Sequence, residues 1–185
     1  MLKEVSLDFA TRLINHGPVV LVSSLYKDKV NITPVAWHMP VSKKPPIIAL
    51  EIGENHYIYE CILGSRDFVI NIPPKTAVEK IVQCGSCSGR DVDKVKICGF
   101  EIQPSKEIKS FGIKGMVGVL ECVFKEDKHL LEEYNIVLGE VKRVLADERN
   151  FNEHWLFVDD DMKTVHHLGN RTFCFPDGDI KDLRN

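Results

Sequence analysis

The sequence predicts a mainly β protein, an antiparallel barrel with short helices attached to it. Several segments rich in β-branched residues are separated by turn residues. The helical patterns are short, and they do not alternate regularly with the strands as a doubly wound parallel sheet would require. The chain has 185 residues, of which 44% are hydrophobic and 28% charged. This length and composition suit a single globular domain over residues 1–185.

The beginning of the chain is predicted to form a helix and then a β-hairpin. Ser6 is a candidate N-cap, and the apolar residues after it fall on one helical face until Gly17-Pro18 ends the element. β-branched residues then predominate in 19–26. A polar Lys-Asp-Lys segment separates them from a second extended run, so we expect residues 19–33 to form the hairpin.

The rest of the chain is expected to contain more strands with two helices between them. The strands are predicted at residues 45–52, 67–73, 115–128 and 134–147, with a final extended piece at 166–175. Asn55 is a candidate cap for one helix, which Gly64 ends. A second helix is predicted from Thr76 to Gly85. Residues 85–112 are rich in turn residues and charge, which indicates a loop with short helical pieces.

Charge and motifs exclude several classes of function. The formal net charge is −3, and no block of Lys or Arg suggests a nucleic-acid partner. The longest apolar runs are too short to span a membrane, and Glu4 and Asp8 rule out a secretory signal, so we expect a cytoplasmic protein. Dinucleotide-fold, P-loop, nucleophile-elbow and helical zinc motifs are all absent from the sequence.

The cysteines are expected to be reduced thiols, as is usual for intracellular proteins. Cys84 and Cys87 stand out among the six because they form the motif C-G-S-C. No second Cys or His pair follows at metal spacing, so a structural zinc site is not supported. Two interpretations remain open for this motif, a redox-active pair or the end of a helix followed by a Gly/Ser turn.

Residues 31–42, NITPVAWHMPVS, have a composition that a strand would not need for packing alone. Thr33 is predicted to end a strand, because Pro34 removes a backbone donor. The backbone of 35–37 could then bind a planar heterocycle rich in carbonyls and ring nitrogens, with Trp37 against the ring. Ser42 and the lysines after it could meet an anionic tail. The alternative is a β-bulge with a packed Trp.

Four stretches carry a resemblance to a known family. They read NITPVAWHMPVSKKPPIIALEI, ENHYIYECILGSRDFVINIP, CGSCSGRDVDKVK and HHLGNRTF, and together they cover roughly residues 15–175. In this order they resemble the flavin reductase-like family of FMN-binding split barrels, and most closely its flavoredoxin branch. The resemblance implies a Greek-key antiparallel split β-barrel with short flanking helices.

The resemblance also implies a function. It indicates a homodimer that binds FMN noncovalently and transfers electrons or hydride through it, without any protein side chain acting as nucleophile or general acid. An FMN-dependent oxidoreductase with NAD(P)H as donor is the first interpretation. The alternatives are an electron carrier between redox protein partners and a flavin-binding module without turnover.

The residues expected at the cofactor follow from the same resemblance. They are Asn31, Thr33, Ala36 and Trp37 near the flavin ring, Ser42 near the ribityl-phosphate end, Asn55 and His56 at the phosphate, Ser88, Arg90 and Lys94 in a covering loop, and His167 on the last strand. The family often has Thr where this chain has Ile58, so one phosphate contact is missing. For Arg90 a solvated turn, for His56 ordinary surface exposure and for His167 a packing role remain alternatives, and His38 is expected to be structural.

Overall fold

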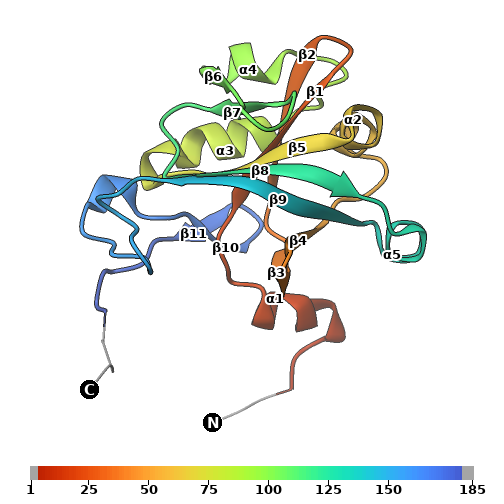
Figure 1. Cartoon of the computed structure of the whole chain (residues 1–185). Helices are drawn as coiled ribbons and strands as arrows, with labels where there is room; N and C mark the ends of the chain where they lie inside the picture. Colours follow the sequence, from red (N-terminus) through yellow and green to blue (C-terminus); the bar gives the residue numbers. More distant parts are fainter. Residues whose placement is uncertain (1–3, 181–185) are drawn as a thin grey trace.

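The computed structural model describes residues 4–180 and has a curved β-sheet with helices around it (Figure 1). The strands are β1 (Val20–Tyr26), β2 (Lys29–Val35), β3 (His38–Lys43), β4 (Pro46–Glu51), β5 (Asp67–Ile72), β6 (Ile102–Pro104), β7 (Phe111–Ile113), β8 (Gly118–Lys125), β9 (Ile136–Ala146), β10 (His166–Gly169) and β11 (Thr172–Cys174). The α-helices are α1 (Ala10–Ile14), α2 (Tyr57–Ser65), α3 (Val78–Gly85), α4 (Lys94–Ile97) and α5 (Lys128–Tyr134). Short 3₁₀ turns lie at Leu7–Phe9, Lys75–Ala77 and Asp160–Met162.

A seven-stranded antiparallel sheet has the order β2-β1-β5-β8-β9-β4-β3. Its two outermost strands are consecutive in the chain, and only Ala36 and Trp37 separate them. The three residue steps from Val35 to His38 span at most about 11 Å. A flat sheet of this order would place its edges about 29 Å apart. The sheet therefore curls into a barrel, which stays split because β2 and β3 do not pair with each other within residues 4–180. This confirms the predicted fold class.

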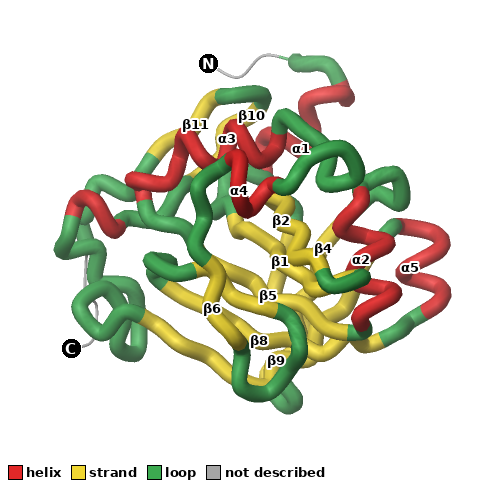
Figure 2. Tube along the Cα trace, turned by 90° about the horizontal axis from the view of Figure 1, so that it is seen from above, coloured by secondary structure: helices red, strands yellow, loops and turns green. Residues whose placement is uncertain are grey.

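The strands of the barrel are buried on both faces. Val20 and Val22 of β1 belong to an apolar cluster that α2 helps to fill, through Ile58 and Ile62. Leu21, which points to the opposite face, packs in a second cluster that includes α3. Figure 2 shows the helices around the rim of the strands. The two clusters fix α2 and α3 on opposite sides of β1 and β2.

The prediction for the 31–42 stretch is corrected in one respect. The second strand does not end at Thr33, because β2 continues to Val35, which pairs with Val20. Residues 38–43 then form β3, which the sequence analysis treated as a loop. The pairing of β3 with β4 shifts in register between Pro40 and Ser42, away from Trp37.

Helix boundaries differ from the predictions for physical reasons. His56 rather than Asn55 is the N-cap of α2, and neither side chain makes a capping hydrogen bond. The helix continues past Gly64 and ends with Arg66 in the left-handed conformation. Gly64 instead permits close packing, since a Cβ there would lie 2.1 Å from the ring of Tyr26 on β1. Helix α5 was missed, although Asp127 caps it by accepting a hydrogen bond from the Leu130 amide.

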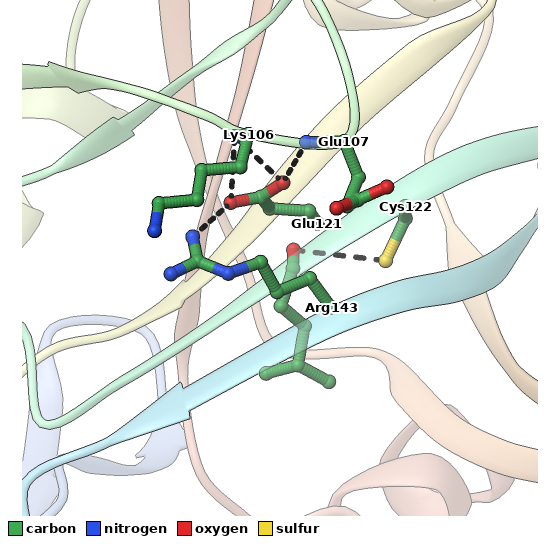
Figure 3. A network of polar contacts seen from close by, with 6 residues as sticks. Lys106, Glu107, Glu121, Cys122 and Arg143 are labelled. Atoms are coloured by element: carbon green, nitrogen blue, oxygen red, sulfur yellow. Dashed lines mark hydrogen bonds and ion pairs between the residues drawn. The ribbon is translucent and has the colours of Figure 1, made fainter.

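Buried polar side chains anchor the long connection that carries β6 and β7. Glu121 on β8 is 2% exposed and accepts hydrogen bonds from the amides of Lys106 and Glu107, the second at 2.8 Å (Figure 3). Arg143 on β9 donates to the same carboxylate at 2.7 Å. Asn71 on β5 similarly accepts a hydrogen bond from the Ile113 amide at 2.8 Å. Burial would raise the pKa of Glu121, but the Glu107 and Lys106 amides and the Arg143 guanidinium together hold it below its ordinary value.

We predict that Glu121→Gln lowers the free energy of unfolding at neutral pH by about 2–3 kcal/mol, because Arg143 loses its buried partner. The folded-state pKa of Glu121 lies below its ordinary value of 4.5. Its stabilisation is therefore present above about pH 4.5 and is lost as the pH falls through the lower folded pKa. Urea unfolding from pH 7 to pH 3 should show the difference from the parent protein shrinking in this acid range.

Glu126→Gln is the matched control for this measurement. Glu126 follows the same strand and pairs with Arg66 at the surface, so its loss should change stability by no more than about 0.5 kcal/mol. Equal effects of the two substitutions would show that Glu121 does not anchor the connection.

Candidate functional site

Three cavities meet at Pro34, near the end of β2. The first, of about 360 Å³, lies between Pro34, the start of α2 and the loop that follows α3. The second, of about 180 Å³, lies between residues 33–37 and residues 51–53. The third, of about 240 Å³, lies between Pro34, α3 and the β10–β11 hairpin. We call this continuous set of cavities the β2 trough.

The trough exists because β2 is an edge strand. Pro34 has no backbone N–H, which costs nothing on the unpaired edge of a sheet. Pro34 pairs with Leu21 on its inner side, and its outer side is open to the cavities. Most of the residues predicted to contact the cofactor line the trough. They are Thr33, Ala36, Trp37, Asn55, His56, Ser88, Lys94 and His167.

Arg90 does not line the trough but holds its wall in place. Its Nη1 donates a hydrogen bond to the carbonyl of Asn55 at 2.9 Å, and its Nη2 lies 3.4 Å from the Glu60 carboxylate. The guanidinium carbon is 5.2 Å from the centre of the Tyr57 ring. These contacts tie the loop after α3 to the start of α2. The guanidinium group of Arg90 therefore has protein partners, and its contact with a cofactor stays a prediction.

Asn31 lies directly beneath the cavity wall with its amide unpaired. The residue is 4% exposed, and neither Nδ2 nor Oδ1 has a hydrogen-bond partner within residues 4–180. Buried polar groups nearly always have partners, so this amide is a candidate for contact with a ligand. Position 89 lines the first cavity directly above Asn31, and only glycine fits there. A Cβ at position 89 would lie 1.9 Å from Asn31 Oδ1.

Lys94 places a positive charge in the first cavity. The residue begins α4 and is 5% exposed, and its ammonium group makes no hydrogen bond or ion pair in the part of the chain that the structure describes. A buried charge without a partner is costly. The Lys94 ammonium group at this cavity is therefore available to a ligand.

The start of α2 faces the same cavity. Asn55, His56 and Tyr57 line it, and the helix has no side-chain cap, so its first amides are available to an anion. Ile58 is fully buried in the barrel core and points away from the cavity. It supplies no polar contact, as its departure from the family pattern led us to expect.

Trp37 and His38 have different roles at the end of the trough. Trp37 is 47% exposed, so it is not the packed Trp of the alternative interpretation. The backbone carbonyl of Trp37 accepts a hydrogen bond from the Glu51 amide at 2.9 Å. Trp37 also lines the second cavity. His38 is structural, as expected. Its Nε2 lies 2.8 Å from the Pro18 carbonyl oxygen, and burial lowers its pKa.

His167 and Ser42 lie apart from the first cavity. His167 on β10 lines the third cavity, with Nε2 2.9 Å from the Asn170 carbonyl oxygen and its ring 5.4 Å from that of Phe173. It therefore combines the packing role with a place in the trough. Ser42 pairs with Ile47 in the β3–β4 hairpin and lines none of the three cavities.

Sequence reasoning missed several trough residues, and for understandable reasons. Pro34 was interpreted only as the end of a strand, and Gly85 and Ser86 only as a turn. All three line the first and the third cavity. The available signal was the position of C-G-S-C directly before S-G-R-D, which joins a helix end to the covering loop. Residues 4–180 contain no group of three or more His, Cys, Asp or Glu side chains that could hold a metal ion.

Comparisons with known proteins give the family of the chain. The family model described as "Flavin reductase like domain" matches residues 12–166. An uncharacterised Escherichia coli (strain K12) protein, YddH, is 36% identical over 176 residues, which are 91% of this chain and 92% of that protein. No described helix is long and apolar enough to cross a membrane.

Two solved structures are similar over nearly the whole chain. One is an FMN-binding domain of a flavin reductases-like enzyme from Shewanella baltica OS155, with 27% identity, a TM-score of 0.85, and coverage of 96% of this chain and 95% of the other. The other is the flavoredoxin of Desulfovibrio vulgaris (Miyazaki F), with 22% identity, a TM-score of 0.80 and 91% coverage of both chains. At 22% identity, the similarity to the flavoredoxin is evidence for a shared fold only.

We predict that Lys94→Met stabilises the ligand-free protein by about 1 kcal/mol, because it removes a buried charge that has no protein partner and keeps a chain of similar length. Lys96→Met is the matched control on the exposed side of the same helix, where the change should stay within about 0.5 kcal/mol. Urea unfolding of ligand-free protein measures both. A clear loss of stability in Lys94→Met would contradict the assignment of its ammonium group to a ligand.

Proposed function

The chain belongs to the family of flavin reductase like domains, and on that premise we propose that it binds FMN noncovalently in the β2 trough and acts as an FMN-dependent oxidoreductase. One observation carries the proposal. A lysine without a protein partner and an uncapped helix start line a single cavity, and a buried unpaired amide, that of Asn31, lies beneath Gly89 in its wall. No contact within the described residues uses these groups.

The residues present fit FMN at its phosphate end. Lys94 supplies a positive charge, and the start of α2 supplies backbone donors with Asn55 and His56 beside them. Gly89 keeps the covering loop close to Asn31, whose amide has donors and an acceptor free for polar groups of the cofactor. In this proposal the phosphate is bound by α2 and the loop, and Ile58 takes no part.

The residues present also fit the ring end. In the proposal Thr33 donates its hydroxyl to the polar edge of the ring, Ala36 offers its backbone, and Trp37 packs beside the ring. Bound FMN supplies the redox chemistry, and the protein supplies binding, orientation and electrostatics. Lys94 favours negative charge on the bound cofactor. Ser42 lies outside the trough of its own chain, so its predicted cofactor contact is the weakest of the set.

The third cavity favours an enzyme over a simple carrier. A reductase needs space for a second substrate beside the flavin, and this cavity adjoins the trough at Pro34 and Ala36. Its lining is mostly apolar, and the polar exceptions are Ser86, His167, Asn170 and Arg171. The proposed donor is NAD(P)H, whose flat nicotinamide suits such a space. An electron carrier of flavoredoxin type is the second candidate, favoured by the half-exposed indole of Trp37 as part of a docking surface for a redox protein.

A homodimer is part of the proposal. Strand β3 is an edge of the sheet, and its apolar residues Met39 and Val41 are 57% and 51% exposed. Trp37 continues this patch. Exposed apolar edge strands are usually covered, and a second copy of the chain is the proposed cover.

We predict that the purified protein is yellow and releases FMN on acid treatment, as identified by chromatography.

Trp37→Ala should weaken FMN binding by about 1–3 kcal/mol through lost ring packing. Lys94→Met should also weaken binding and lower the midpoint potential by roughly 20–60 mV, because a positive charge is lost. Thr33→Val should mainly shift the potential. Lys96→Met is the control and should change neither quantity. A protein that stays colourless and takes up no added FMN would refute the proposal.

We predict rapid bleaching of the flavin colour when the FMN-loaded protein is mixed anaerobically with NADH or NADPH, as expected for a reductase. Stopped-flow absorbance measures the rate. If neither nucleotide bleaches the colour while dithionite does, the carrier assignment replaces the reductase assignment.

We predict that light scattering at micromolar concentration gives about twice the chain mass. Val41→Asp should give a monomer, since it places a charge in the proposed apolar interface. Val144→Asp, at a 60% exposed position on β9, is the control and should leave the dimer intact. A monomeric parent protein would count against this part of the proposal.

A further inference from the structure

Trp37 stands between two cavities, and one side chain of the N-terminal segment contacts its indole. Trp37 lines the second cavity of the trough together with Thr33 and Ala36. It also lines a fourth cavity of about 260 Å³, whose other lining residues include Asn15 and Met39. A Trp side chain has two rotatable bonds, so an unrestrained indole at 47% exposure could turn toward either cavity.

The side-chain amide of Asn15 satisfies its neighbours in one orientation only. With the amide oxygen toward the indole, Oδ1 accepts a hydrogen bond from Trp37 Nε1 at 2.7 Å, and Nδ2 donates to the Ala36 carbonyl oxygen at 3.3 Å. The opposite orientation would bring two oxygens together at Ala36 and two N–H donors together at Trp37, so neither bond could form. The Ala36 carbonyl therefore orients the amide, and the amide oxygen holds the indole.

The backbone is held on both sides of this contact. Asn15 follows α1, and its backbone N–H donates to the Thr11 carbonyl oxygen at 2.9 Å. Two residues further on, the Gly17 carbonyl oxygen accepts a hydrogen bond from the His167 amide at 3.0 Å. On the other side, the Trp37 carbonyl oxygen accepts from the last amide of β4 at 2.9 Å. Rotation of the indole is the freedom that remains, and the Asn15 amide limits it.

We propose that Asn15 is a positioning residue that holds the Trp37 indole at the ring end of the trough. The inference rests on the proposed function, which places Trp37 beside the flavin ring. Asn15 lines the fourth cavity and none of the three cavities of the trough, so it acts through Trp37 and not by contact with the cofactor. An indole that is already oriented loses less conformational freedom when the ring binds, which strengthens binding.

Hydrogen exchange of the Trp37 indole N–H tests the contact in cofactor-free protein. The chain has two tryptophans, so Trp155→Phe leaves Trp37 as the only indole signal in a proton–nitrogen NMR spectrum. We expect this N–H to exchange at least about fivefold more slowly than that of a free tryptophan amide, because a hydrogen bond protects it. Asn15→Leu has a side chain of similar size that accepts no hydrogen bond, and it should remove the protection.

Affinity for FMN tests the role of the contact in the proposed site. Asn15→Leu should weaken FMN binding by roughly threefold to tenfold, the range for one lost hydrogen bond. Fluorescence titration of cofactor-free protein with FMN measures the affinity. In a Trp37→Ala background the same substitution should change the affinity by less than about twofold, because residues that act through one contact are not additive. A general structural role of Asn15 would instead give equal losses in both backgrounds.

Two further variants separate this contact from a general effect on α1. Asn15→Asp keeps an oxygen that accepts from the indole, so the exchange rate should stay within about threefold of that of the parent protein. Leu13→Ala is the matched control. It changes a 68% exposed residue of the same helix that lines none of the four cavities, and it should alter neither the exchange rate nor the affinity.

Other outcomes would overturn the proposal. An indole N–H that exchanges as fast as a free tryptophan amide in the Trp155→Phe protein would do so, as would an unchanged FMN affinity in Asn15→Leu or a loss that persists in full in the Trp37→Ala background. If Asn15→Leu does not fold, as judged by circular dichroism, the exchange rate of the Trp155→Phe protein decides the question alone. If the protein takes up no FMN, the proposed function fails, and the same exchange rate still decides whether Asn15 holds the indole.

Discussion

The connection of only two residues between β2 and β3 is the constraint on which the rest of the structure depends. It joins the two edges of a seven-stranded sheet, and so it forces the sheet to curl into a barrel. The barrel stays split, because β2 pairs only with β1 and β3 only with β4 within residues 4–180. The trough lies where the split remains. The candidate site is therefore a direct result of the way the barrel is formed.

The buried polar side chains fall into two classes, those with hydrogen-bond partners in the protein and those without. Glu121, Asn71 and Asp67 are buried and satisfied, and they hold the connection around β6 and β7 against the barrel. Asn31 is buried and unsatisfied within the described residues and lies beneath Gly89 in the wall of the first cavity, and Lys94 lines that cavity without a protein partner for its ammonium group. A fold tolerates such a cost where it serves another purpose. The contrast between the two classes therefore marks the candidate site independently of cavity volume.

The loop between α3 and α4 forms one wall of the first cavity. Arg90 ties it to α2, Gly89 brings it close to Asn31, and Lys94 and Cys87 face the cavity from it. Any change in this loop would alter the cavity that the flavin proposal assigns to FMN.

The sequence by itself determined the fold class, most of the strands and the composition of the trough. Apolar runs with β-branched residues must be buried on two faces, and Thr33, Trp37, His56 and Lys94 stand in stretches whose order resembles a known family. Local signals failed where long-range packing decided the outcome. Gly64 was interpreted as a helix end, but the ring of Tyr26 requires it inside α2.

Only the tertiary structure decided which residues meet. Arg90 and Ser42 stand in the same motifs as the trough residues. The Arg90 guanidinium, however, contacts Asn55 and Glu60, and Ser42 lies in the β3–β4 hairpin. The unpaired state of Asn31 is also invisible in the sequence. Partners of a buried polar group come from residues distant in the chain, so the sequence shows that such groups exist, and the fold alone shows which of them are left for a ligand.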